Sequence, residues 1–144
     1  MMVNYLAVVF GITVGLYIII QFKKTGLEKK HWVYPALLAT FPVYYWLFAI
    51  SASDYAALEK EAVIGFLFVA LALIAYKIES FAGLLLLGMG YVCHAIYDVG
   101  HNQAFVNQGT PLWWPEFCGA VDLLVGLYIF YYALSSNGCQ TKNA

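Results

Sequence analysis

Residues 3–22 read VNYLAVVFGITVGLYIIIQF, and no side chain in this run carries a charge. As an α-helix, a run of this length extends about 30 Å, which matches the hydrocarbon core of a bilayer. Lys23 and Lys24 follow the run directly, whereas residues 1–5 contain no basic side chain. A secretory signal peptide has the opposite arrangement, with its positive charge before the apolar run. The sequence therefore predicts an uncleaved transmembrane helix whose N-terminus lies outside the cell.

The composition of the whole chain agrees with a protein embedded in lipid. Apolar residues make up 63% of the 144 residues and charged residues 10%, and the mean hydropathy is +0.76. A soluble domain has about 45–50% apolar and about 25% charged residues, so a soluble enzyme is excluded. All 7 basic residues are lysines, and an arginine-rich surface that would bind nucleic acid is missing from the sequence. We therefore expect an all-α, polytopic transmembrane helical bundle in the cell membrane.

Four further apolar runs are separated by the few charged residues. Together with the first run, they predict five spans in a single transmembrane domain, residues 1–134, followed by a short polar cytoplasmic tail, residues 135–144. The predicted spans are residues 3–22, 32–51, 62–76, 81–99 and 115–134. If the chain crosses the membrane at each span, every lysine except Lys60 lies on the same side. Because basic loops stay in the cytoplasm, this asymmetry predicts an N-out, C-in topology.

Ionisable side chains inside a membrane are costly, and this sequence gathers several at the end of the fourth span. Residues 94–102 read HAIYDVGHN. At about 100° per residue, His94, Asp98 and His101 fall within an arc of about 60°, so a continuing helix presents them as one polar stripe. Gly100 is expected to end the helix before His101.

The fifth span adds Glu116 and Asp122 from the opposite direction. With a rise of about 1.5 Å per residue, Asp122 lies about 9 Å below Glu116, and His94 about 6 Å below Asp98. The two deep residues are therefore expected at similar levels below the outer surface. This convergence predicts an outward-facing polar pocket between the fourth and fifth spans.

Two histidines with carboxylates form a ligand set that Zn, Fe or Mn accepts. We assign His94, His101 and Asp122 as candidate metal ligands. Glu116 is the candidate general base, and Asp98 is the second candidate catalytic residue, as a further ligand or as the group that orients a histidine. A divalent metal would turn a bound water into a nucleophile at neutral pH. The first hypothesis is therefore a metal-dependent membrane hydrolase that acts on a lipid or an amphiphile.

Three alternatives stay open. Without a metal, Asp98 or Asp122 could orient a histidine that acts as a general base. The chain could also be a transporter or ion-binding subunit, although the inner halves of the spans hold no carboxylate or histidine apart from His31 at the boundary. Finally, it could be a structural or accessory membrane protein whose polar cluster only locks the fourth and fifth helices together.

Small residues indicate further contacts. Gly11 and Gly15 form a pattern that lets another helix approach closely, and a homo-oligomer through these two glycines is one expected partner, besides the lipid bilayer and a lipid-like substrate. No nucleic-acid partner is expected. A disulfide between Cys93 and Cys118 is conceivable, because both lie in the outer halves of their helices, but two small packed residues are the favoured interpretation.

The stretch 94–102, the stretch WPEFC at residues 114–118, and Asp122 resemble a family of small prokaryotic integral membrane proteins. The resemblance covers mainly residues 91–128, and the chain length and the number of spans also fit. It implies a membrane protein of unassigned activity and provides no substrate.

Overall fold

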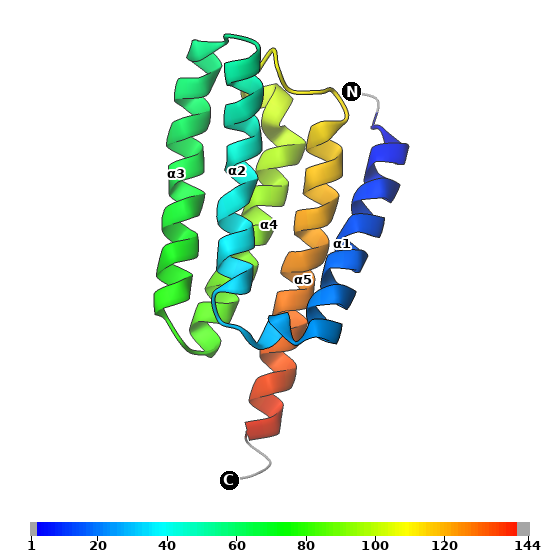
Figure 1. Cartoon of the computed structure of the whole chain (residues 1–144), viewed down its shortest axis with the longest axis vertical. Helices are drawn as coiled ribbons and strands as arrows, with labels where there is room; N and C mark the ends of the chain where they lie inside the picture. The colour runs from blue at the N-terminus through cyan, green and yellow to red at the C-terminus, as the bar shows by residue number, and fades with distance from the viewer. Residues whose placement is uncertain (1–2, 141–144) are drawn as a thin grey trace.

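The computed structural model describes residues 3–140 and, within this range, contains helices and no strands. The elements in chain order are α1 (Tyr5–Thr25), the short 3-10 helix η1 (Leu27–Lys29), α2 (Val33–Ser51), α3 (Tyr55–Lys77), α4 (Phe81–Ala104) and α5 (Trp114–Gln140). The α-helices lie side by side along the long axis of the molecule (Figure 1). The prediction of an all-α bundle is therefore confirmed.

The bundle has two chemically different ends. In Figure 1 the start of α1, the α2–α3 connection and the α4–α5 connection lie together at one end, which we call the loop end. The α1–α2 and α3–α4 connections lie at the opposite end, which we call the lysine end. The lysine end takes its name from Lys23, Lys24, Lys29, Lys30 and Lys77. Among the lysines that the structure describes, only Lys60 belongs to the loop end.

Four of the helices, α1, α2, α4 and α5, are long and apolar enough to cross a membrane. In α3, the first two turns contain Glu59, Lys60 and Glu61, and this helix falls outside that group. Large apolar side chains nevertheless face outward on every helix. Examples in chain order are Leu6, Leu47, Phe66, Ile96 and Leu127. Apolar exposure over the whole surface is typical of a protein whose surroundings are lipid.

Side-chain caps begin two of the helices. Asn4 accepts a hydrogen bond from the Ala7 amide at 3.1 Å at the start of α1. Asp54 accepts one from the Ala57 amide at 3.1 Å at the start of α3. Because Asp54 caps it, α3 begins at Tyr55, before the predicted span of residues 62–76.

Two helices continue beyond their predicted ends. The expected stop at Gly100 is wrong, because α4 continues to Ala104. The space beside Gly100 is open, and the next side chain, His101, is fully buried in the bundle. This burial outweighs the low helix propensity of a single glycine. The last helix, α5, passes the predicted end at residue 134 and reaches Gln140, and residues 141–144 of the predicted tail lie outside the described residues.

The first helix packs against α5 through small residues. A Cβ atom added at Gly11 would lie 2.4 Å from the carbonyl oxygen of Phe117 and 2.9 Å from the Cβ atom of Ala120. One added at Gly15 would lie 3.0 Å from the Leu124 side chain. The glycine face for which we expected a homo-oligomer contact is thus occupied by α5 of the same chain, and association between copies stays a prediction.

The half of the bundle nearest the lysine end is filled by apolar side chains. Leu38 of α2, Leu87 of α4, and Val125 and Ile129 of α5 are at most 2% exposed. The buried carboxylates and histidines of the described residues lie in the half nearest the loop end.

Candidate metal centre

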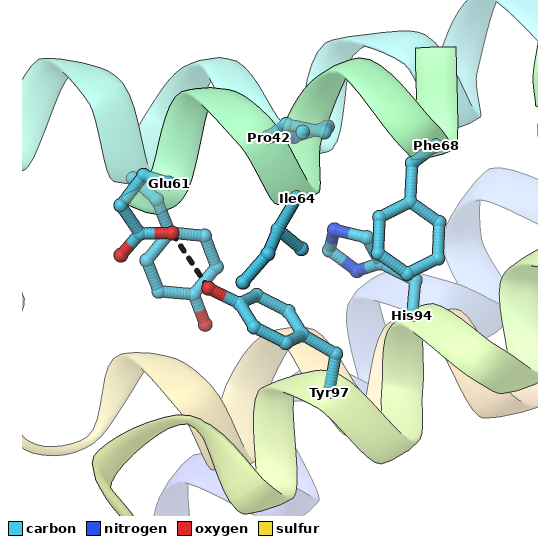
Figure 2. A pocket seen from close by; sticks show the side chains of 8 residues that line it. Pro42, Glu61, Ile64, Phe68, His94 and Tyr97 are labelled. Carbon is cyan, nitrogen blue, oxygen red and sulfur yellow. Dashed lines mark hydrogen bonds between the residues drawn. The ribbon is translucent and has the colours of Figure 1, made fainter. Parts of the chain in front are cut away.

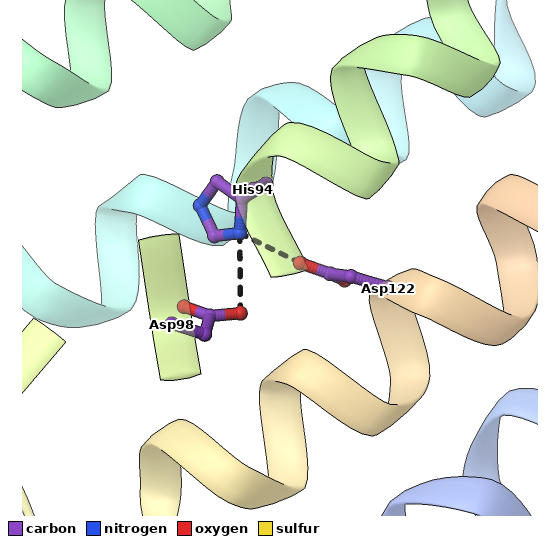
Figure 3. A group of neighbouring side chains, drawn as sticks. All are labelled: His94, Asp98 and Asp122. Carbon is purple, nitrogen blue, oxygen red and sulfur yellow. Dashed lines mark hydrogen bonds and ion pairs between the residues drawn. The ribbon is translucent and has the colours of Figure 1, made fainter. Parts of the chain in front are cut away.

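His94 of α4 lies between two carboxylates (Figure 3). Its Nδ1 atom donates a hydrogen bond to Asp122 Oδ2 of α5 at 2.6 Å and lies 3.3 Å from Asp98 Oδ2, one turn further along α4. All three side chains are at most 1% exposed. One potential ligand atom of each residue lies within 4.8 Å of the other two. We call this compact buried group the His94 cluster.

The His94 cluster forms where α4 and α5 come close together. The spacing of four residues places His94 and Asp98 on the same face of α4. On α5, a Cβ atom added at Gly119 would lie 3.3 Å from the carbonyl oxygen of Ala95 and 3.5 Å from the Cβ atom of Asp98. The missing side chain at Gly119 therefore lets α5 come near enough for Asp122 to reach His94.

Each member of the His94 cluster has a buried polar atom without a hydrogen-bond partner. These atoms are His94 Nε2, Asp98 Oδ2 and Asp122 Oδ1. Buried polar groups are normally paired, and each unpaired one costs about 1–3 kcal/mol. Two carboxylates beside one imidazole also leave a surplus negative charge, unless a carboxylate takes up a proton. A bound cation on the Nδ1 side of the imidazole would offset that charge and provide partners for the two carboxylate oxygens, although not for Nε2 on the other side of the ring. The residues present therefore fit a divalent metal ion.

Tyr45 of α2 connects the His94 cluster to a second polar group. Its hydroxyl donates a hydrogen bond to Asp98 Oδ1 at 2.8 Å. Its ring stacks on the imidazole of His101, with the ring centroids 4.4 Å apart. Tyr45 is 1% exposed, so this connection is completely inside the bundle.

The second polar group is centred on Glu61 of α3, and we call it the Glu61 cluster. Glu61 Oε1 accepts hydrogen bonds from His101 Nε2 at 2.7 Å and from Asn107 Nδ2 at 3.0 Å. Glu61 Oε2 accepts one from the Tyr97 hydroxyl at 2.6 Å, which Figure 2 shows. Both oxygens of this carboxylate have hydrogen-bond donors. The Glu61 cluster is therefore satisfied by its own side chains, in contrast to the His94 cluster.

A narrow space separates the two clusters. Figure 2 shows His94 beside Phe68 at one side of this space, Glu61 and Tyr97 at the other, and Ile64 between them. The ring of Phe68 packs edge-on against the His94 imidazole, with 4.6 Å between centroids. The space is too narrow for a water molecule, so its walls exclude water from this side of His94 in the observed conformation.

The structure brings together three of the five predicted site residues, namely His94, Asp98 and Asp122. His101 pairs with Glu61 instead. Glu116 lies away from both clusters, in a groove that α1, α4 and α5 line. Cys93 is exposed and Cys118 is buried, and both are free thiols, so the conceivable disulfide between them is not formed.

Four side chains of these clusters were not among the predicted site residues. They are Tyr45, Glu61, Tyr97 and Asn107. Glu61 has the clearest sequence signal, because it is a carboxylate directly beside the apolar run of residues 62–76. Tyr45 is one of 12 tyrosines, and Asn107 lies in a connection, so no spacing rule identifies either residue.

Comparison of the chain with protein-family models, with curated proteins and with solved structures finds no match. The function is therefore inferred from the geometry of the two clusters.

Proposed function

We propose that this protein is a five-span membrane protein, with its N-terminus outside and its C-terminus in the cytoplasm, that binds a divalent transition metal at the His94 cluster. One observation supports the binding of a metal ion. Three buried ligand atoms lie within 4.8 Å of one another, and both carboxylates have a buried oxygen atom without a hydrogen-bond partner.

The direction of the charged side chains supports α3 as the fifth span. Glu61 points into the bundle, where it is 2% exposed and bonded to His101. The outward face of α3 carries Phe66, Leu67 and Leu73. This helix therefore presents apolar side chains to lipid, although its first turns contain charges. The lysines at one end of the bundle support the orientation, because basic connections stay in the cytoplasm.

The donor atoms suit a small transition metal. Zn, Fe and Mn accept imidazole nitrogen and carboxylate oxygen as ligands. Ligand atoms that share such a metal, with bonds of about 2.1 Å, lie roughly 3 Å apart. The distances from His94 Nδ1 to Asp122 Oδ2 and Asp98 Oδ2, 2.6 and 3.3 Å, lie on either side of that value. One ion held by these three side chains would take the place of the proton that His94 Nδ1 donates to Asp122.

For the loaded site we propose hydrolysis of a lipid or an amphiphile. A divalent metal activates water or polarises a carbonyl group for this chemistry. Asp122 lies about 12 Å along α5 from Trp114, a depth at which membrane lipids are the available substrates. We assign no general base, because Glu116 lies in a separate groove.

The metal content of the purified protein tests this proposal. After incubation with Zn, Fe(II) or Mn and removal of free metal, elemental mass spectrometry should find one ion per chain in the wild type. His31→Ala is the control, because this histidine lies at the lysine end, and it should retain the same amount. His94→Ala and Asp122→Asn should retain little metal. Release of fatty acid from lipid vesicles by the loaded wild type, and not by His94→Ala, tests the hydrolase.

The variant His101→Gln distinguishes the two ligand sets. Retained metal supports His94, Asp98 and Asp122 as the ligands, whereas a loss equal to that of His94→Ala supports the set predicted from sequence, in which His101 is a ligand. A wild type that binds no metal, together with lower thermal stability of Asp98→Asn and Asp122→Asn, would overturn the proposal. The cluster would then be a hydrogen-bonded network that only locks α4 to α5.

A further inference from the structure

A groove with a volume of about 350 Å³ lies on the face of the bundle formed by α1, α4 and α5. Apolar side chains and Gly119 form its wall, and Glu116 is its single ionisable lining residue. None of the lining residues belongs to the His94 cluster. The groove borders the cluster at the α4–α5 contact, where a Cβ atom added at Gly119 would lie 3.5 Å from the Cβ atom of Asp98. The groove is therefore a separate site.

The groove has the dimensions of a single hydrocarbon chain. On α5 its lining begins at Glu116 in the first turn and ends at Leu127. These positions are separated by about 16 Å along the helix axis. Across the groove, Val8 and Ile12 of α1 complete the apolar wall. A chain that lies parallel to the helices, as lipid tails do, would fill this space.

Glu116 determines the chemistry at the loop end of the groove. Its Oε2 atom is buried and has no hydrogen-bond partner. No lining residue is basic, so the carboxylate has no counter-charge from a side chain of the groove and only the partial charge of the α5 N-terminus beside it. An unpaired charge beside apolar walls is costly, and a ligand that brings both a donor and a positive charge removes that cost. An alcohol would bring only the donor, and a fatty acid would add a second negative charge.

We propose that the groove binds a single-chain amphiphile whose head group is a primary ammonium directly attached to the alkyl chain. The ammonium contacts Glu116, and the chain lies along α5 toward Leu127. This inference depends on the membrane location of the bundle and not on a metal at the His94 cluster.

Calorimetric titration of the full-length protein in lipid nanodiscs tests the inference, with empty nanodiscs as the reference for partitioning. The probes are dodecylamine, dodecanol and dodecanoate, which share one chain length. Dodecylamine should bind at least about tenfold more tightly than dodecanol, which corresponds to one charge-assisted contact. Dodecanoate should bind most weakly.

Two pairs of variants locate the site. Glu116→Gln should lower the affinity for dodecylamine to that for dodecanol. Glu59→Gln, which removes an exposed carboxylate of α3, should leave the affinity for both probes unchanged. Leu123→Trp fills the groove and should weaken all probes, whereas Leu67→Trp, at an exposed position of α3, should not. Equal affinity of the wild type and Glu116→Gln for dodecylamine, or unchanged binding in Leu123→Trp, would overturn the proposal. Metal content measured on the same samples keeps this outcome separate from that of the His94 cluster.

Discussion

The hydroxyl of Tyr45 and the Nδ1 atom of His94 are the described donors that approach the two carboxylates of the His94 cluster. We expect Tyr45→Phe to leave Asp98 Oδ1 buried without its donor, which lowers the stability of the protein by about 1–3 kcal/mol. Tyr44→Phe is the matched control, because Tyr44 is the neighbouring residue and faces outward. Thermal unfolding in detergent measures the stability of both variants. Equal midpoints for the two variants would show that Asp98 does not depend on this hydroxyl.

The Glu61 carboxylate accepts hydrogen bonds from three side chains, those of His101, Asn107 and Tyr97. In Glu61→Gln the amide nitrogen cannot accept a hydrogen bond, so at least one of the three buried donors loses its acceptor. A buried donor without an acceptor costs about 1–3 kcal/mol, so this variant should unfold at a clearly lower temperature. The control Glu59→Gln changes an exposed side chain and should unfold like the wild type. A Glu61→Gln protein as stable as the wild type would mean that the three donors do not depend on the second carboxylate oxygen.

Among the helices, two glycines allow a matched comparison of packing. The Gly11→Ala substitution places a Cβ atom against the main chain of α5, and we expect it to destabilise the protein by about 1–3 kcal/mol as α1 is displaced. Gly100→Ala meets open space inside α4, so it should stabilise the protein by roughly 0.5–1 kcal/mol through its helix propensity. Thermal midpoints of both variants in one detergent give the comparison. The same direction of change in both would contradict the packing of α1 on α5.

The helices themselves were predictable because a run of apolar residues between charges depends only on local sequence. Their ends were not, since α4 passes Gly100 on account of the burial of His101. The same limit applies to the site. The spacing of His94 and Asp98 places them on one face, and depth brings Asp122 to their level, but a helical face does not specify which neighbour it meets. The pairing of His101 with Glu61 depends on the packing of α3 against α4, which no local pattern encodes.

In the whole molecule, polarity is distributed unevenly along the bundle axis. Both clusters lie toward the loop end, and the apolar core that contains Leu38, Leu87 and Val125 lies between them and the lysine end. Ion pathways through membranes require polar groups along their length, and the buried residues of this core include tyrosines but no carboxylate or histidine. This arrangement favours a site that a ligand reaches from one side of the membrane. It does not favour a transport pathway.

The orientation of the chain in the membrane can be measured at the two ends of α3. Glu59 near the loop end and Glu79 at the lysine end are both exposed carboxylates, and α3 connects them. With the native cysteines replaced by serine, we expect Glu59→Cys to react with a membrane-impermeant thiol reagent in intact cells. Glu79→Cys should react only after permeabilisation, because basic connections stay in the cytoplasm. Reaction of both positions from the same side would mean that α3 does not cross the membrane. The reverse pattern would place the His94 cluster nearer the cytoplasm, and the groove at Glu116 would then take its amphiphile from the inner leaflet.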